Sequence, residues 1–269
     1  MLKFANAKIN IGLHVTKKRG DGYHELETVF YPVKLYDAVE LVSSEELALT
    51  IWNSTLDADD ENLCLKAFHL LAQDFHLEPI QIHLLKNIPI GAGLGGGSSD
   101  ASATLLLLNE YFNLDLDVEQ LKKYAAKLGA DCPFFIENKP VYGEGTGTEL
   151  SPISLDLSQY KIVIVKPEIH ISTKEAYENV IPQAPEINLK DAIKLPIQEW
   201  KYLINNNFEL ALFDKYPQIA DIKTKLYEKG AIYASMSGSG SAVFGVFSQT
   251  ESLDELKRYG QVYFPNENI

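Results

Sequence analysis

A run of glycines in the first half of the chain constrains its fold more than any other feature. Residues 87–103 read NIPIGAGLGGGSSDASA, and five of the seven residues from Gly91 to Gly97 are glycine. Glycine loses more conformational freedom on folding than any other residue, so such a run is rarely packing material. The strand-like segment IQIHLLKNI precedes it, and the apolar helix-like segment ASATLLLLNEYFNL follows it. The sequence therefore predicts a glycine loop between a strand and a helix that starts at Ser98–Asp100.

A loop of this composition suits an anionic ligand. A helix N-terminus offers N–H groups without helical partners and a partial positive charge, and glycines let the backbone wrap closely around a phosphate. Ser98 and Ser99 add hydroxyls for a phosphate or a bound metal. A plain tight turn would need only one or two glycines. We therefore expect this loop to bind phosphate groups.

The common phosphate-binding loops match this segment poorly. The P-loop pattern requires Gly-Lys-Ser/Thr, and no lysine lies within the loop. Gly91, Gly93 and Gly96 fit the dinucleotide pattern G-x-G-x-x-G as text, but so dense a glycine run satisfies it by chance. A dehydrogenase built on this loop would also need a parallel sheet, which the strand pattern does not favour. The protein-kinase loop lacks its H-R-D and D-F-G partners.

The charge and composition of the chain limit its partners. The formal net charge is −13, which repels nucleic acid, so an anionic ligand needs a local positive site. Cys64 and Cys132 lie far apart, which favours a reducing compartment over a disulfide framework. The N-terminus has polar residues where a signal peptide has its apolar core, and no apolar run is long enough for a membrane span. We expect a cytoplasmic protein, monomer or homodimer, with no nucleic-acid or membrane partner.

Strand-like and helix-like segments mix without regular βαβ alternation. This favours an α+β fold in two subdomains over a doubly wound sheet. The polar, proline-bearing segment SPISLDLSQ predicts a boundary, and we divide the chain into domains 1–152 and 153–269. The expected strands are 3–15, 26–44, 47–53, 80–88, 160–167, a strand–turn–strand segment at 231–248, and 261–265. The expected helices are 62–75, 98–114, 117–129, 172–180, 198–212, 216–229 and 252–260, with turn and hairpin structure at 131–136 and 140–150.

Three segments together resemble one family of enzymes. The loop PIGAGLGGGSSDASA resembles the second motif of the GHMP small-molecule kinases, named for galactokinase, homoserine kinase, mevalonate kinase and phosphomevalonate kinase. AKINIGLHV near the N-terminus resembles their first motif, and MSGSGSAVFG, residues 236–245, resembles their third. The order and spacing match along nearly the whole chain. The resemblance implies the two-subdomain GHMP kinase fold, ATP and Mg²⁺ as cofactors, and an active site in the cleft between the domains.

Within this family, AKINIGLHV, GYHEL and LGADCPFF resemble the branch that acts on a cytidine-diphosphate-linked methylerythritol. This implies ATP-dependent phosphorylation of the 2-hydroxyl of that small molecule, a step in the non-mevalonate route to isoprenoids. GYHEL discriminates, because the other GHMP kinases do not need to read a cytosine. The alternatives are a GHMP kinase for another small alcohol and a non-catalytic ligand sensor. Such sensors commonly lose the catalytic lysine or aspartate, whereas Lys8 and Asp131 are both present.

Lys8 and Asp131 are the expected catalytic residues. The resemblance makes Asp131 the carboxylate that accepts the hydroxyl proton, although from the residues alone a turn aspartate is the commoner interpretation. Lys8 lies in an otherwise apolar strand, where an unpaired ammonium is expensive to bury. We hypothesise that Lys8 pairs with Asp131, keeps it ionised and helps to stabilise the developing alkoxide.

The expected ATP cradle runs along the loop, with one lysine just ahead of it. Lys86 either touches the nucleotide or is a solvated strand lysine. The cradle residues are Pro89, Ile90, Gly91, Ala92, Gly93, Leu94, Gly95, Gly96, Gly97, Ser98 and Ser99. Mg²⁺ is expected to arrive with ATP, held by its phosphates and a serine hydroxyl. No carboxylate ligand can be named, and no cysteine–histidine cluster suggests a structural metal.

Aromatic residues are the expected readers of the substrate's base. The resemblance makes Tyr23 and His24 cytosine readers; otherwise they are surface residues that cover a strand edge. Tyr177, in the segment ISTKEAY, is either a second stacking aromatic or a core residue of its helix.

Further substrate contacts are expected from polar and glycine residues. Asn10 is two positions from Lys8 and shares its strand face, so it either contacts substrate hydroxyls or is a buried structural asparagine. Gly238 and Gly240 either form a second backbone approach to the phosphates or belong to a β-turn with serines. Asn62 either borders the nucleotide pocket or caps a helix.

Overall fold

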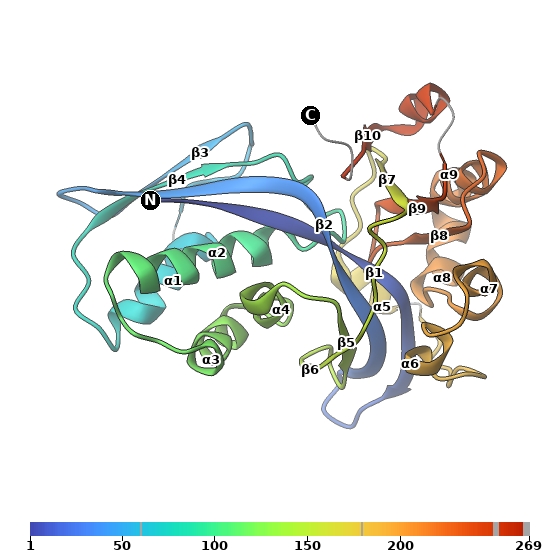
Figure 1. Cartoon of the computed structure of the whole chain (residues 1–269), viewed down its shortest axis with the longest axis horizontal. Helices are drawn as coiled ribbons and strands as arrows, with labels where there is room; N and C mark the ends of the chain where they lie inside the picture. The colour runs from blue at the N-terminus through green and yellow to red at the C-terminus, as the bar shows by residue number, and fades with distance from the viewer. Residues whose placement is uncertain (60, 179, 250–252, 266–269) are drawn as a thin grey trace. The chain divides into compact units, whose positions relative to one another are not determined.

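The computed structural model describes residues 1–59, 61–178, 180–249 and 253–265, and its chain forms two compact units (Figure 1). Unit 1 comprises Met1–Ala7, Leu35–Ile90 and Gly95–Lys139, and unit 2 comprises Lys8–Lys34, Gly91–Leu94 and Pro140–Ile269. The long strands β1 (Leu2–Lys18) and β2 (His24–Ser43) each contribute residues to both units. The compact units change over between residues 139 and 140, and the predicted domain boundary after residue 152 stays a prediction.

The sheet of unit 1 is built from neighbouring strands of mixed direction. β3 (Ala48–Trp52) lies parallel to β4 (Ile80–Leu85), and β4 lies antiparallel to β2, with Ala38 opposite Leu85. Because successive side chains of a strand point to opposite faces, the alternating apolar residues of these strands turn toward one core. Ile82 and Leu84 of β4 are buried in this way.

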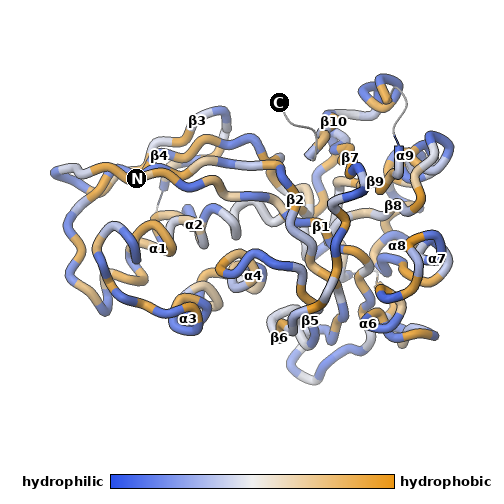
Figure 2. Tube along the Cα trace, viewed as in Figure 1, coloured by the Kyte–Doolittle hydropathy of each residue, from blue (hydrophilic) through white to orange (hydrophobic). Residues whose placement is uncertain are grey.

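Helices of unit 1 share one apolar core with this sheet. They are α1 (Leu63–Ala72), α2 (Gly96–Tyr111), α3 (Val118–Leu128) and α4 (Cys132–Glu137). The core contains residues of β2, β4 and all four of these helices. Hydrophobic and hydrophilic residues alternate along α3 (Figure 2), and its buried residues Leu121 and Ala125 are four apart, on one helix face. Asp117 and Gln120 form a capping box at its start.

Unit 2 contains a hairpin and a second sheet. The first half of β2 pairs with β5 (Val141–Glu144), and β5 pairs with β6 (Glu149–Pro152), so the predicted hairpin is confirmed. The second sheet has antiparallel neighbours in the order β10 (Gln261–Tyr263), β7 (Lys161–Lys166), β9 (Val243–Phe247) and β8 (Tyr233–Met236). Its helices are α5 (Thr173–Glu178), α6 (Leu189–Ala192), α7 (Ile197–Leu203), α8 (Phe208–Lys215), α9 (Pro217–Glu228) and the 3-10 helix Asp254–Tyr259.

The predicted α+β class is confirmed, and three local predictions are corrected. Helix α2 begins at Gly96 rather than at Ser98. Residues 131–136, predicted as a turn, form most of helix α4, whose proline lies in the first turn, where its missing N–H costs nothing. The predicted helix 198–212 is divided into α7 and α8, because Leu13 of β1 exchanges backbone hydrogen bonds with residues 205 and 207 between them.

Two predicted helices reach into residues that the structure does not describe. The helix predicted at 172–180 is observed as α5, and Asn179 lies outside the described residues. The helix predicted at 252–260 is observed as a 3-10 helix from Asp254, and Ser252 lies outside the described residues. None of the described helices is both long and apolar enough to cross a membrane.

Candidate functional site

The glycine loop joins β4 to α2 and has a left-handed backbone at alternate residues. Gly91, Gly93 and Gly95 have φ angles of 60°, 74° and 71°. These are angles that a residue with a side chain adopts only with strain. Gly95 is the N-cap of α2, and this position makes no side-chain capping hydrogen bond. The loop thus leads into a helix start whose N–H groups suit an anion.

In unit 2, the middle of the loop packs against the turn that follows β8. The Gly93 carbonyl accepts hydrogen bonds from Lys8 Nζ at 3.1 Å and from Ser237 Oγ at 2.8 Å. A Cβ atom on Gly93 would lie only 1.9 Å from the Ser237 carbonyl oxygen. On either side, Ala92 O accepts the Ala242 N–H and Leu94 O accepts the Lys8 N–H. Backbone therefore meets backbone here, and only glycine fits at position 93.

Lys8 and Asn10 lie side by side on β1, as their spacing predicts. Lys8 is 3% exposed, and its Nζ donates to Asn10 Oδ1 at 2.6 Å and lies 5.3 Å from the centroid of the Phe30 ring. Asn10 Nδ2 donates to Thr28 Oγ1 at 2.9 Å, and the Asn10 N–H donates to Ser237 Oγ at 3.2 Å. The interpretation of Asn10 as a buried structural asparagine is confirmed, and its contact with a substrate stays a prediction.

The turn containing Gly238 and Gly240 belongs to unit 2. Their φ angles are 54° and 86°, and the Gly240 N–H donates to the Ser237 carbonyl at 2.9 Å. The β-turn with serines is therefore confirmed. A Cβ on Gly238 would lie 3.2 Å from both Asn10 Oδ1 and Gly93 O, so the turn approaches β1 and the glycine loop closely. Its approach to phosphates stays a prediction.

The aromatic residues predicted as base readers come together in unit 2. The rings of His24 and Tyr177 are stacked, with centroids 5.1 Å apart and planes at 22°. Tyr177 also meets Phe208 edge to face, with centroids 4.8 Å apart. Tyr23, next to His24 in the chain, exposes 67% of its surface. The structure thus gives an aromatic pair from two distant segments and one exposed ring beside it in sequence.

Lys86 occupies a buried charged cluster in unit 1, so its interpretation as a solvated lysine is wrong. It is 4% exposed, and its Nζ donates to Asp37 and, at 2.6 Å, to Asp100 Oδ2. Asp37 Oδ1 also accepts the Ile88 N–H at 2.8 Å. Burial raises the pKa of Asp100 to about 7, and Asp37 adds to the rise against the opposing effect of Lys86. The cluster ties the residues before the glycine loop to Asp100, the fifth residue of α2, and a nucleotide contact of Lys86 stays a prediction.

Most of the other predicted cradle and catalytic residues of unit 1 lie at helix starts. Gly96, Gly97, Ser98 and Ser99 form the first turn of α2, in which Ser99 is buried. Pro89 and Ile90 precede the loop, and Ile90 is exposed. Asp131 is half-buried at the N-cap of α4, and its side chain makes no capping hydrogen bond. The pairing of Asp131 with Lys8 stays a hypothesis.

Sequence reasoning missed several polar residues around the loop and the turn. Asp37 and Asp100 were not predicted; Asp37 lies in a strand that also contains glutamates and a lysine, so its burial gave no local signal. Asn206 and Glu209, which hold the end of β8, gave no recognisable signal. Asn62 accepts the Cys64 N–H at 2.9 Å, so its helix-capping interpretation is confirmed. Among the described residues, no three His, Cys, Asp or Glu side chains gather as a metal site.

Family models match both halves of the chain. The model for the GHMP kinases N terminal domain matches residues 62–139, and the model for the GHMP kinases C terminal matches residues 189–265. Curated relatives named 4-diphosphocytidyl-2-C-methyl-D-erythritol kinase are similar over most of their length. The one from Bacteroides thetaiotaomicron is 53% identical and covers 95% of each chain. The one from Parabacteroides distasonis is 47% identical and covers 98% of this chain and 97% of its own.

Solved structures agree with these relatives. A crystal structure of 4-(cytidine 5'-diphospho)-2C-methyl-D-erythritol kinase is 31% identical, covers 98% of each chain and superposes with a TM-score of 0.84. A crystal structure of mevalonate kinase, 17% identical with a TM-score of 0.72, shares the fold alone. The chain therefore belongs to the GHMP family of small-molecule kinases, and within it to the group of relatives named 4-diphosphocytidyl-2-C-methyl-D-erythritol kinase.

Proposed function

We propose that the protein transfers the γ-phosphoryl group of ATP to the 2-hydroxyl of 4-diphosphocytidyl-2-C-methyl-D-erythritol, giving the 2-phosphate and ADP. The reaction would supply isoprenoid precursors by the non-mevalonate route. Use of ATP follows from membership of a kinase family. The choice of acceptor is supported by the names of relatives that are 44–53% identical to this chain.

The observation that carries the choice of acceptor is the stacked pair of His24 and Tyr177. A nucleobase binds well against aromatic faces, at about 1–3 kcal/mol per stacked base. Tyr23 beside the pair offers a further exposed ring. Mevalonate and homoserine have no base, so a kinase for those alcohols gains nothing from such an arrangement. We assign Tyr23, His24 and Tyr177 to the cytosine.

The glycine loop is assigned to the phosphates of ATP. Its left-handed glycines and the uncapped start of α2 leave backbone N–H groups to hold anionic oxygens. The acidic chain, with a net charge of −13, requires such local donors. The buried cluster of Lys86, Asp37 and Asp100 fixes both ends of this loop. The loop would therefore keep its shape before the nucleotide binds, which avoids an ordering cost on binding.

Asp131 is assigned as the group that accepts the proton of the 2-hydroxyl as the oxygen attacks the γ-phosphorus. Phosphoryl transfer depends mainly on positioning and on charge stabilisation. Lys8 is assigned the stabilisation of charge, because its ammonium lies at the Gly93 carbonyl of the glycine loop and is held there by Asn10. A cation in that place would stabilise negative charge that develops during transfer.

Mg²⁺ is assigned to the phosphates rather than to a protein cage. The described residues contain no cluster of three His, Cys, Asp or Glu side chains, whereas Mg²⁺ that arrives with a nucleotide needs few protein ligands. Ser98 and Ser99, in the first turn of α2, supply hydroxyl oxygens that fit it. When bound, the ion would neutralise phosphate charge.

A coupled assay of ADP release tests this proposal. The cytidyl-diphospho substrate is compared with mevalonate, homoserine and galactose at equal concentrations of ATP and Mg²⁺. We expect turnover with the first, and a loss of at least about 100-fold in kcat for Asp131→Asn. Faster turnover of another alcohol would instead support a different GHMP kinase. Ligand binding without any turnover would support a non-catalytic sensor.

A further inference from the structure

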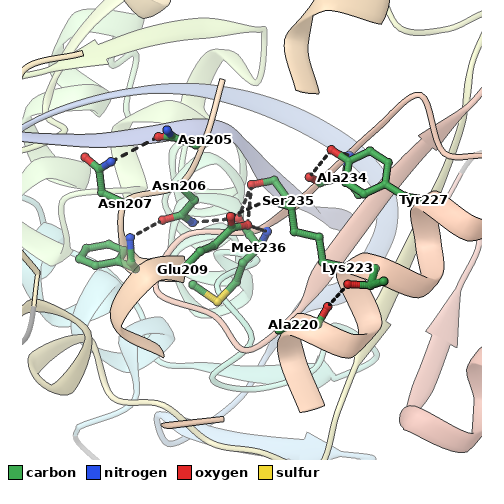
Figure 3. A network of polar contacts seen from close by, with 12 residues as sticks. Asn205, Asn206, Asn207, Glu209, Ala220, Lys223, Tyr227, Ala234, Ser235 and Met236 are labelled. Carbon is green, nitrogen blue, oxygen red and sulfur yellow. Dashed lines mark hydrogen bonds and ion pairs between the residues drawn. The ribbon is translucent and has the colours of Figure 1, made fainter. Parts of the chain in front are cut away.

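Two buried polar residues support the turn that follows β8: Asn206, in the chain between α7 and α8, and Glu209, in the first turn of α8. Asn206 is 2% exposed and Glu209 is 6% exposed, and both direct polar atoms at the end of β8 (Figure 3). Leu13 of β1 fixes the backbone of this segment, because its N–H donates to Asn205 O and its carbonyl accepts the Asn207 N–H. Two buried polar side chains thus lie on a firmly held backbone.

Both polar atoms of the Asn206 side-chain amide form hydrogen bonds. Its Nδ2 donates to the Met236 carbonyl and to the Gly238 carbonyl, both at 2.8 Å. Its Oδ1 accepts the Phe208 N–H at 3.0 Å. A carboxylate of the same shape could accept from Phe208 but could donate to neither carbonyl. The two carbonyls therefore require an amide at this position.

Glu209 accepts hydrogen bonds at the same strand end, where Asn206 binds the Met236 carbonyl and Glu209 binds the Met236 N–H. Its Oε1 accepts the Met236 N–H at 2.8 Å and the Ser235 hydroxyl at 3.2 Å, and its Oε2 pairs with Lys223 at 2.5 Å (Figure 3). The peptide groups on both sides of Met236 are thus fixed. The turn begins from a strand end whose orientation is determined by α8 and α9.

The bond from Asn206 to the Gly238 carbonyl also orients the next peptide N–H. In a planar trans peptide, the N–H points opposite to the carbonyl, so the Ser239 N–H points away from Asn206. The Gly240 N–H is already used by the Ser237 carbonyl. Within the described residues, the Ser239 N–H donates to no acceptor, and Ser239 is half-exposed between two buried glycines. A free, oriented backbone donor is the kind of group that binds phosphate oxygen.

We propose that Asn206 is a positioning residue that presents the Ser239 N–H to a phosphate group of a bound nucleotide. The inference rests on the proposed function for the identity of the phosphate, which belongs either to ATP or to the cytidine diphosphate of the acceptor. Asn206 acts only through the turn and contacts neither ligand.

Binding measurements on Asn206→Asp test this proposal. The matched control is Asn205→Asp, which makes the same chemical change one residue earlier on an exposed side chain. Dissociation constants are measured by calorimetry for ADP, cytidine diphosphate, adenosine and cytidine. We expect Asn206→Asp to raise the dissociation constant of one or both diphosphates at least about 10-fold, while that of each nucleoside changes by no more than about 2-fold. Weaker binding of ADP would assign the Ser239 N–H to a phosphate of ATP, and weaker binding of cytidine diphosphate would assign it to the acceptor. Equal losses for diphosphate and nucleoside, or no loss, would overturn the proposal.

A second readout uses the wild-type protein, so it stands even where Asn206→Asp fails to fold. In ¹⁵N-labelled protein, ADP or cytidine diphosphate should shift the Ser239 amide resonance, whereas the matching nucleoside should not. The Ser158 amide, which donates to Asp156 Oδ1, should stay in place. A stationary Ser239 amide would overturn the inference. Because neither experiment measures phosphoryl transfer, failure of the proposed reaction would leave both results interpretable.

Discussion

Replacement of Gly93 by alanine tests the close packing of the glycine loop on the turn after β8. The new Cβ would lie 1.9 Å from the Ser237 carbonyl oxygen, so the two backbones must separate by about 1 Å before reaching even the 3.0 Å limit of real contacts. Both segments are held by further bonds, because the Gly93 carbonyl accepts from Lys8 and Ser237. The clash cannot be relieved by rotation of a side chain.

The expected cost has two parts. A φ of 74° costs an alanine about 1–2 kcal/mol, and forced displacement in a packed region costs about 1–3 kcal/mol more. The sum of roughly 2–5 kcal/mol would lower Tm by roughly 4–9 °C in a chain of 269 residues. Calorimetry or circular dichroism at a fixed scan rate measures the shift.

Gly97→Ala is the matched control within the same glycine run. It lies in the first turn of α2, and its Cβ would meet only Leu63 Cδ1, at an ordinary 3.8 Å. Alanine is favoured over glycine in a helix by roughly 0.5–1 kcal/mol, so Tm should stay level or rise slightly. Equal Tm values for Gly93→Ala and Gly97→Ala would refute the packing argument.

Three further predictions concern the other sites. The pKa of Asp100 is raised to about 7 from an ordinary 3.8, so the folded protein binds a proton that the unfolded chain releases; the unfolding free energy of the wild type should therefore rise relative to that of Asp100→Asn as the pH falls from 7 to 5. Urea titrations that give the two proteins the same change in unfolding free energy between these pH values would contradict this. Burial raises the pKa of Cys64 to about 12 and that of Cys132 to about 11, so a maleimide should label neither thiol until urea unfolds the protein, and rapid labelling of the native protein would disprove their burial. His24→Ala should raise KM for the cytidyl substrate roughly 10-fold with KM for ATP unchanged, since one stacking face is lost; equal effects on both substrates would remove His24 from the base site.

Local patterns predicted most elements of the fold. The glycine loop, the hairpin after residue 140 and the strand–turn–strand around the third motif follow from composition and alternation. The start of α2 was misplaced by two residues, because the sequence favours serine as a helix cap whereas Gly95 takes that position. The division of helix 198–212 could not be predicted, because the segment gives up helical bonds to pair with Leu13, nearly two hundred residues away in sequence.

Site residues could be predicted where they belong to a recognisable motif. They could not be predicted where contacts between distant segments determine their role. His24 and Tyr177 were named by resemblance, and the structure stacks them. From the sequence alone, Lys86 could be a nucleotide contact or a solvated lysine, because nothing near it in sequence reveals its partner Asp37 on another strand. Asn206 likewise follows no motif, and only its bonds to Met236 and Gly238 reveal what it holds.

Phosphorus NMR of the reaction mixture tests most directly whether one phosphoryl group moves from ATP to the 2-hydroxyl of the cytidyl-linked methylerythritol. Carbon 2 of a 2-C-methylerythritol carries no hydrogen, so its phosphomonoester resonance should show no three-bond proton splitting. We predict one unsplit phosphomonoester resonance whose integral matches the ADP formed, and which Asp131→Asn produces at least about 100-fold more slowly. A split phosphomonoester signal, or ADP formed with inorganic phosphate alone, would contradict the account.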